Sequence, residues 1–175
     1  MFEYVELSHL GVYGIRSIPN TDSRGMFLRV LEVANVAEEF EPCEISLATN
    51  LSSGTLRGMH FQRGALAESK VISCISGRIF DVGIDLRENS PSYLNSVCVE
   101  LGPKSEFQGL LLPSGYAHGY MSLEDNSQII YVMDKPYSSS SASGYRWDDK
   151  AFDITWPISP KYISDKDMNW EDFKR

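Results

Sequence analysis

The sequence has 175 residues, with 42% hydrophobic and 23% charged, as is usual for a globular chain that can bury a substantial core. Its formal net charge of -8 argues against sequence-independent binding to nucleic acid, although a local basic pocket for a small anion is compatible with that charge. No apolar run approaches the length of a membrane span, and the first residues are acidic where a secretory signal is basic. Three dispersed cysteines predict reduced thiols in a cytoplasm: Cys43, Cys74 and Cys98.

Alternation of apolar and polar residues, which is typical of half-buried strands, recurs along most of the chain. In chain order, a short helix is expected over Leu31–Phe40, strands follow, and a second short helix is expected over Asn169–Lys174. The predicted strands are Glu44–Asn50, Arg57–Gln62, Val71–Ile75, Ile79–Leu86, Ser96–Leu101, Gly109–Leu112, His118–Leu123 and Gln128–Met133. The Ser76-Gly77 pair predicts a hairpin between the third and fourth of these strands. Many short strands with turns between them predict one all-β sandwich or barrel domain over residues 1–175.

The segment Leu56–Gln62 combines a cation, a group that can transfer a proton and an amide within one strand. Alternation along this strand predicts that Arg57 lies on one face and that His60 and Gln62 lie on the other. A histidine that faces a pocket beside an arginine suits a site that holds an anion and moves a proton. The ordinary alternative is a histidine on the surface or in the core that only completes hydrogen bonds.

Other polar groups fall at positions where a half-buried sheet favours apolar ones. Lys70 has the same parity as Ile72, and Tyr131 has the same parity as Ile129, so each is expected on an interior face. A buried lysine needs a partner or a function, whereas a lysine at the start of a strand can also reach solvent. Tyr131 could equally be a core tyrosine with a satisfied hydroxyl, and Asp167 could be only a helix cap.

Taken together, in order and spacing, these segments resemble the dTDP-4-dehydrorhamnose 3,5-epimerase family of cupins. The resemblance covers nearly the whole chain and rests on Ser23–Phe27, Leu56–Gln62, Lys70, Gly77–Arg87, Ser90-Pro91, Pro113–Tyr120, Tyr131, Tyr137, Trp147–Asp149, Ile154–Pro157 and Ile163–Asp167. It implies an all-β jelly-roll cupin barrel, a double-stranded β-helix with short peripheral helices. It also implies a homodimer that exchanges N-terminal strands, and a reaction that uses no cofactor.

The substrate that this resemblance implies is a nucleotide-linked 4-keto-6-deoxyhexose, whose ketone acidifies the hydrogens on C3 and C5. His60 matches the family's base, and Asp167 matches the carboxylate that orients it. Lys70 matches the cation beside the C4 oxygen, where negative charge develops during the reaction. Tyr131 matches the proton donor on the opposite face of the sugar ring.

The resemblance also implies a set of substrate contacts, mainly around the diphosphate and the nucleotide: Arg24, Arg29, Asn50, Arg57, His118, Tyr137 and Lys166. Tyr137 matches the aromatic side chain that stacks on the base, and Arg24 would come from the neighbouring subunit. Three positions depart from the family, because Arg29 replaces a glutamate, Ala48 a glutamine and Ala142 a glutamate. The departures lie toward the nucleotide, so we expect a nucleotide other than dTDP, with CDP or GDP leading.

The sequence therefore predicts a nucleotide-sugar epimerase acting at C3, C5 or both, in deoxysugar supply for a surface polysaccharide such as O-antigen lipopolysaccharide or for a glycosylated metabolite. A cupin 3,4-ketoisomerase on the same substrate class is one alternative. A metal-dependent cupin oxygenase is another, but it needs an HxH pair with further ligands, and the histidines are only His9, His60 and His118. A non-catalytic domain that binds sugar nucleotides is the third, and it would not need the proton-transfer residues.

Overall fold

The computed structural model of the chain describes residues 2–7, 11–33 and 40–174. Its strands are β1 (Phe2–Glu6), β2 (Tyr13–Ser17), β3 (Asn20–Asp22), β4 (Gly25–Phe27), β5 (Glu44–Asn50), β6 (Leu56–Gln62), β7 (Lys70–Ser76), β8 (Ile79–Asp85), β9 (Ser96–Leu101), β10 (Gly109–Leu112), β11 (Tyr116–Ser122), β12 (Ser127–Met133) and β13 (Ala142–Gly144). Besides Val33, which has 3-10 conformation, the described residues form two helical elements. These are the 3-10 turn η2 (Gly64–Leu66) and the four-residue helix α1 (Asp165–Met168).

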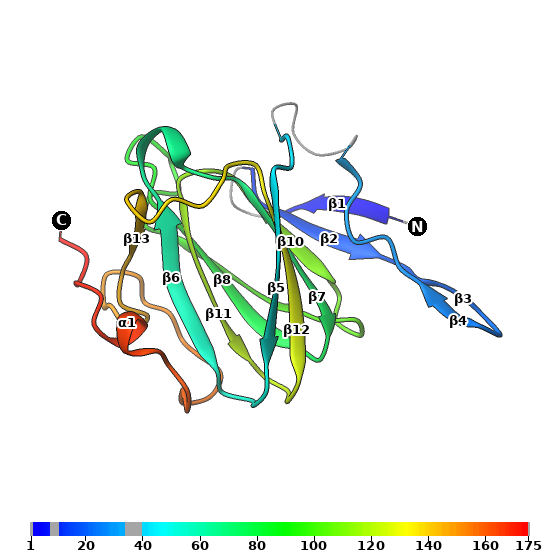
Figure 1. Cartoon of the computed structure of the whole chain (residues 1–175). Helices are drawn as coiled ribbons and strands as arrows, with labels where there is room; N and C mark the ends of the chain where they lie inside the picture. Colours follow the sequence, from blue (N-terminus) through cyan, green and yellow to red (C-terminus); the bar gives the residue numbers. More distant parts are fainter. Residues whose placement is uncertain (1, 8–10, 34–39, 175) are drawn as a thin grey trace.

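Two antiparallel sheets face each other (Figure 1). The larger sheet has the strand order β1-β2-β10-β7-β12-β5, and the smaller has the order β13-β6-β11-β8-β9. The hairpin of β3 and β4 projects from one side of this sandwich, whereas the C-terminal segment with α1 lies along the opposite side, beside β6 and β13 (Figure 1). The arrangement confirms the predicted all-β class and the jelly-roll architecture of two packed sheets.

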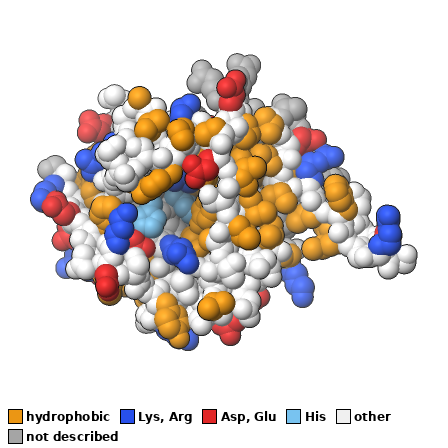
Figure 2. Space-filling view, viewed as in Figure 1, with side chains coloured by type: hydrophobic (Ala, Val, Ile, Leu, Met, Phe, Trp, Pro, Cys, Tyr) orange, Lys and Arg blue, Asp and Glu red, His pale blue; other side chains and the backbone are white. Residues whose placement is uncertain are grey.

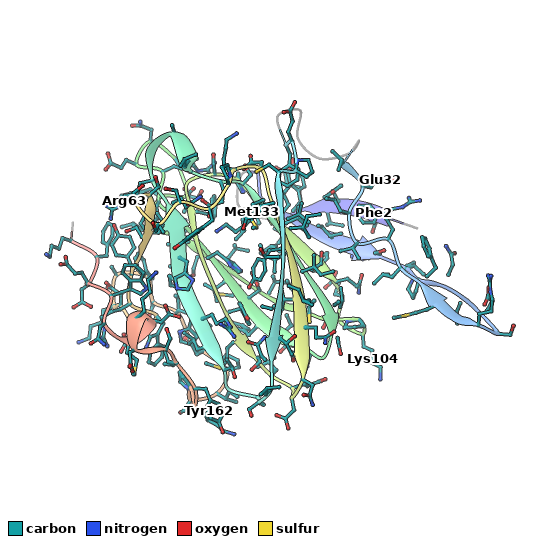
Figure 3. The ribbon with its side chains drawn as sticks, viewed as in Figure 1. Phe2, Glu32, Arg63, Lys104, Met133 and Tyr162 are labelled. Carbon is teal, nitrogen blue, oxygen red and sulfur yellow. The ribbon has the colours of Figure 1, made fainter. Side chains whose placement is uncertain are left out.

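Alternation along the strands separates an interior core from two outer clusters. On β7, Ile72 faces the core between the sheets, whereas Val71 joins a cluster on the outer face of the larger sheet. On β12, Ile129 likewise faces the core, whereas Val132 belongs to the cluster on the outer face. Side chains from both sheets fill the space between them (Figure 3). The interior faces of β7 and β12 therefore run from an apolar core toward a polar end of the sandwich, which holds the candidate site.

The predicted strands are confirmed to within two residues at each end, but the predicted hairpin at Ser76-Gly77 is wrong. Strand β7 belongs to the larger sheet and β8 to the smaller, so the chain crosses between sheets instead of turning back on itself. Gly77 permits this crossing because it has φ +72°, and a Cβ there would lie 2.4 Å from Ser127 Oγ. Sequence spacing alone does not distinguish these two connections.

The two helix predictions have different outcomes. The helix expected over Leu31–Phe40 falls mostly on residues 34–39, which lie outside the described residues. The helix expected over Asn169–Lys174 is wrong, because the helical turn lies earlier, at α1. Ser164 caps that turn by accepting a hydrogen bond from the Asp167 amide at 3.1 Å. Within the described ranges, no helix is long and apolar enough to cross a membrane.

Candidate active site

A cavity of about 500 Å³ opens between the two sheets at the polar end of the sandwich. It is lined from both sheets and from the C-terminal segment by Glu44, Ser46, Ala48, Arg57, His60, Phe61, Gln62, Glu68, Lys70, His118, Tyr120, Tyr131, Met133, Lys135, Tyr137, Ala142, Ser143, Ser164, Lys166, Asp167 and Trp170. Figure 2 shows histidine side chains at the bottom of this hollow, with lysine and arginine side chains around its mouth. Met133, labelled in Figure 3, lies at the end of β12 and pairs across the sheet with Lys70.

The side chains of Arg57 and His60 on β6 both line the cavity, so the strict alternation predicted for this strand is wrong. The register against β11 shifts between the pairs His60–His118 and Arg57–Tyr120. Two residues of β6 therefore oppose one residue of β11, which is a β-bulge that turns the following side chains to the other face. Gly58 is required there, because a Cβ would lie 2.5 Å from the Gly119 Cα and its φ is +141°.

His60 and Asp167 form a close pair, with His60 Nε2 at 2.6 Å from Asp167 Oδ1. The histidine side chain is 44% exposed toward the cavity, whereas that of Asp167 is only 6% exposed. Asp167 also accepts hydrogen bonds from the Gly58 amide and from the indole of Trp170. Burial alone would raise the pKa of Asp167, but the interaction with His60, and to a smaller extent the hydrogen bonds from Gly58 and Trp170, lower it below the ordinary value. An ionised Asp167 accepts the Nε2 proton, so the lone pair of neutral His60 lies on Nδ1.

Lys70 enters the cavity from β7, on the opposite sheet from His60. It is buried, as its parity with Ile72 predicts, and its Nζ lies 2.6 Å from Glu68 Oε1. The sequence reasoning missed Glu68, which is also buried and has an Oε2 atom without a hydrogen-bond partner among the described residues. The carboxylate of Glu68 is the counter-ion of the Lys70 ammonium group. The ion pair therefore has no net charge, although Lys70 still places a positive charge beside the cavity.

Tyr131 lies beside Lys70 on the neighbouring strand β12 and faces the same cavity. Burial raises the pKa of Tyr131 well above the ordinary phenol value, and the neighbouring Tyr120 adds to this rise. Tyr131 therefore stays protonated at neutral pH and remains available as a proton donor. Tyr120 donates a hydrogen bond to Asn50 Oδ1 at 3.0 Å, and Arg57 Nε donates to the same atom at 3.1 Å.

His118 forms the second histidine–aspartate pair, with its Nε2 at 2.9 Å from Asp81 Oδ2. Both side chains are almost completely buried, at 6% and 0% exposure. The ring of His118 packs edge-on against Tyr131, with the centroids 5.9 Å apart. His118 thus lines the floor of the cavity beside the candidate proton donor.

The mouth of the cavity contains Tyr137 and Lys166, and the two small residues Ala48 and Ala142 also line its wall. Three predicted substrate contacts do not line this cavity within one chain. Asn50 is buried and accepts hydrogen bonds from two residues that do line it, Tyr120 and Arg57. Arg24 lies in the projecting hairpin, where it pairs with Asp22. Arg29 pairs with Glu32, and neither arginine lines this cavity.

Among the cavity residues that had no predicted role are Glu68, Tyr120 and Trp170, each of which contacts a predicted site residue. Tyr120 has the same parity as His118 on its strand, a signal that could have placed it at the cavity. Glu68 and Trp170 lie in irregular segments, where the sequence offers no periodic signal. Within the described part of the chain, no group of three or more histidine, cysteine, aspartate or glutamate side chains is arranged to hold a metal ion.

A family model described as dTDP-4-dehydrorhamnose 3,5-epimerase matches residues 6–175. The chain belongs to that family. It is 34% identical over 156 residues to the dTDP-4-dehydrorhamnose 3,5-epimerase of Shigella flexneri, covering 87% of this chain and 85% of that relative. It is 33% identical to the Methanothermobacter thermautotrophicus enzyme of the same name, over 97% of this chain and 94% of that relative.

Solved structures of the family have the same fold. The epimerase from Bacillus anthracis, solved with TDP and PPi bound, superposes with a TM-score of 0.90 at 27% identity and covers 99% of this chain and 100% of that chain. A 4-keto-6-deoxy sugar epimerase from the novobiocin gene cluster of Streptomyces spheroides gives a TM-score of 0.90 at 26% identity, over 98% of this chain and 87% of that chain. This chain is therefore an isomerase of the carbohydrate epimerase type.

Proposed function

We propose that this protein inverts C3, C5 or both of a nucleotide-linked 4-keto-6-deoxyhexose. One observation carries the proposal: His60 projects into the cavity from the smaller sheet, whereas Tyr131 and Lys70 project from the larger sheet that faces it. Inversion of a carbon next to a ketone needs a base on one face of the ring and an acid on the other. The position of His60 on one side of the cavity and of Tyr131 and Lys70 on the other supports the assignment of His60 as the base and Tyr131 as the acid.

The proton and electron steps balance without an external oxidant or metal. His60 Nδ1 takes the proton from the carbon next to the C4 ketone, and the electron pair of that bond moves onto the C4 oxygen. Lys70 donates to the enolate oxygen, where the negative charge develops. The Tyr131 hydroxyl then gives its proton to the opposite face of the same carbon, and the enolate returns to the ketone. Solvent carries the proton from His60 back to Tyr131 before the next turnover.

The test is a proton NMR record of a 4-keto-6-deoxyhexose nucleotide incubated with the enzyme in deuterated water. The proposal expects deuterium to replace hydrogen at C3, C5 or both, with inverted stereochemistry in the product. A 3,4-ketoisomerase would instead move the carbonyl to C3. A non-catalytic binding domain would bind the nucleotide sugar without any exchange, and that outcome would refute the proposal.

The proposed reaction needs no metal or redox cofactor, because the substrate's own ketone makes the carbon acidic. Prolonged treatment with a strong chelator should therefore leave turnover unchanged within about twofold, whereas removal of a catalytic metal would lower it by several orders of magnitude. If the activity disappears and returns on addition of a divalent ion, a metal-dependent reaction replaces this one.

We further propose a homodimer in which the β3–β4 hairpin reaches the other subunit. Hydrophobic side chains are exposed over the outer face of β5 and on the hairpin (Figure 2), among them Ile45, Leu47 and Phe27 at 71%, 62% and 70% exposure. An apolar surface of this kind marks an interaction site, and a second copy would cover it. Arg24, at the tip of the hairpin and away from its own cavity, would then meet the partner's cavity.

Mixing two inactive variants tests this arrangement. Arg24→Ala keeps its own His60, and His60→Ala keeps its own Arg24. Random reassociation makes half of the dimers mixed, and each mixed dimer has one of its two sites complete, so about a quarter of the wild-type activity should return. Without exchange of the hairpin no complete site forms and no activity returns. Analytical ultracentrifugation of Leu47→Asp, which places a charge on the apolar face, should show monomers.

The nucleotide is proposed to differ from dTDP, with CDP or GDP leading. Ala48 and Ala142 line the cavity, so the two methyl groups leave room beside the stacking platform of Tyr137 and remove two hydrogen-bonding side chains. A polar edge that loses its partner costs about 1–3 kcal/mol. Calorimetric titration with dTDP, CDP, GDP and UDP decides this point, and a clear preference for dTDP would show that the substitutions are neutral.

The proposed location is the cytoplasm, which the three free cysteines support.

A further inference from the structure

Trp170 contacts the proposed catalytic base and its aspartate at once. Its indole Nε1 donates to Asp167 Oδ1 at 3.3 Å, which is the oxygen that also pairs with His60. The rings of Trp170 and His60 meet edge-to-face, with centroids 6.4 Å apart and an interplanar angle of 65°. The indole also lines the cavity, so it forms the wall beside the pair.

The Nε1 edge of the indole also packs against a glycine. A Cβ at Gly144 would lie 2.4 Å from Trp170 Cε2 and 2.6 Å from Nε1, closer than real carbon contacts. Gly144 pairs with His60 across β13 and β6, so the indole lies over the strand that carries the base. The missing side chain at Gly144 thus allows the indole to reach Asp167 from the C-terminal segment.

The hydrogen bonds of Asp167 leave little freedom for its carboxylate. Oδ1 accepts hydrogen bonds from His60 and Trp170, and Oδ2 accepts one from the Gly58 amide at 3.4 Å. A carboxylate held by three donors keeps one orientation, and an oriented carboxylate fixes the tautomer and the direction of the histidine ring. Without the indole N–H, His60 would be the only hydrogen-bond donor to Oδ1. The space that the indole fills beside Gly144 would also be empty.

We propose that Trp170 is a positioning residue that holds Asp167, and through it His60, in the geometry for proton abstraction, an inference that rests on the proposed epimerase activity. Its hydrogen bond acts on the base and not on the nucleotide. The loss of this bond therefore lowers kcat and leaves KM almost unchanged.

The choice of variants separates the hydrogen bond from simple packing. Trp170→Phe keeps an aromatic ring, which also lies under the Lys166 ammonium at 5.1 Å from the ring centroid, but removes the N–H. Trp170→His keeps a five-membered ring whose Nε2–H can take the place of the indole N–H, although its ring is smaller than phenyl. Packing alone ranks the phenylalanine variant above the histidine variant, whereas the hydrogen bond ranks them in the opposite order. Trp156→Phe is the matched control, because its indole donates to the Trp147 carbonyl and Trp156 is not among the residues that line this cavity.

The measurements are kcat and KM at about pH 8, where an ordinary imidazole is neutral, and the NMR resonance of the His60 ring N–H, assigned by its loss in His60→Asn. Trp170→Phe should lower kcat about three- to tenfold, the scale of one hydrogen bond, with KM within about twofold. Trp170→His should recover part of this loss, and Trp156→Phe should equal the wild type. The His60 resonance should shift in Trp170→Phe and not in Trp156→Phe.

Two results would overturn the proposal: a Trp170→Phe variant equal to Trp156→Phe in both measurements, or a Trp170→His variant less active than Trp170→Phe. If Trp170→Phe does not fold, Trp170→His against the wild type still decides, because a shifted His60 resonance with full retention of kcat contradicts the role. If the wild type neither exchanges nor converts any nucleotide-linked 4-keto-6-deoxyhexose, the proposed function fails. The NMR comparison then tests the positioning of His60 independently.

Discussion

Two histidine–aspartate pairs lie next to each other in this molecule, because His60 and His118 are cross-strand partners on β6 and β11. Their hydrogen-bond lengths are similar, at 2.6 Å for His60–Asp167 and 2.9 Å for His118–Asp81. Their surroundings differ. The His60 ring faces the cavity with almost half of its surface, whereas the His118 ring is nearly enclosed.

The aspartates differ as much as the histidines do. Asp167 comes from α1, far along the chain, and its two oxygens meet three donors. Asp81 comes from the adjacent strand β8, and its Oδ1 has no hydrogen-bond partner in the described parts of the chain. The same pair of residue types thus forms an accessible pair, the proposed base, in one place and a buried pair in the other. We therefore propose that exposure to the cavity and the further hydrogen bonds of the aspartate, more than the histidine–aspartate pair itself, determine which histidine acts as the base.

The strongest way to break this comparison is to remove the accessible histidine. His60→Asn should lower epimerisation by about 10²–10⁴-fold, the usual scale for a positioned general base. Exchange of substrate hydrogens with deuterated water should fall by the same factor, since the first proton transfer is lost. Nucleotide binding, followed by calorimetry, should survive because its proposed contacts lie elsewhere in the cavity. Exchange at the wild-type rate would show that another group is the base.

Removal of the acid sharpens the comparison, because it separates deprotonation from inversion. Tyr131→Phe should lower the formation of inverted product by about 10²-fold. Exchange with deuterated solvent should fall by only about tenfold or less, because His60 can still remove the proton and return a deuteron to the same face. NMR reports both processes in one sample. Loss of exchange as complete as in His60→Asn would instead make Tyr131 essential for enolate formation.

The sequence predicts the position of a site residue when local strand alternation determines that position, and fails when contacts with distant segments determine it. The interior positions of Lys70 and Tyr131 are predicted correctly because these residues continue the alternation of Ile72 and Ile129 within their strands. Arg57 is predicted on the wrong face because the bulge at Gly58 depends on the backbone of β11, which lies far away in the sequence. Local periodicity therefore predicts side-chain direction only where the pairing register is regular.

The fold shows the same limit. The strands Glu44–Asn50, Ser96–Leu101 and Gly109–Leu112 are predicted with their observed bounds, since each has a clear apolar pattern. The assignment of β7 and β8 to different sheets is not predictable, because it depends on partners such as β10 and β12 and not on the two strands themselves. Glu68 and Trp170 are missed for a related reason, since the contacts that give them a role are all made in three dimensions.

A smaller effect is expected from the buried histidine. His118→Asn should raise KM by about tenfold and change kcat by less than about threefold, because His118 is proposed to contribute to substrate binding and not to proton transfer. Steady-state kinetics with the nucleotide sugar gives both constants. Tyr120→Phe, which removes one hydrogen bond from the same floor of the cavity, is the matched variant and should change KM by less than about threefold. A fall in kcat as large as that of His60→Asn would mean that the two pairs share the proton transfer.

The smallest effect concerns stability and follows from the ionised state of Asp167. Its pKa lies below the ordinary value in the folded protein, so the unfolded chain binds more protons as the pH falls below about 4. This contribution is fully present above that pH and is lost as the pH falls through the lower, folded pKa. Asp167→Asn lacks it, so its free energy of unfolding should fall less between pH 7 and pH 3 than that of the wild type. Urea unfolding at a series of pH values measures both curves. Parallel curves would show that the hydrogen bonds from His60, Gly58 and Trp170 do not stabilise the carboxylate in the folded protein, and the contrast between the two pairs would then rest on exposure alone.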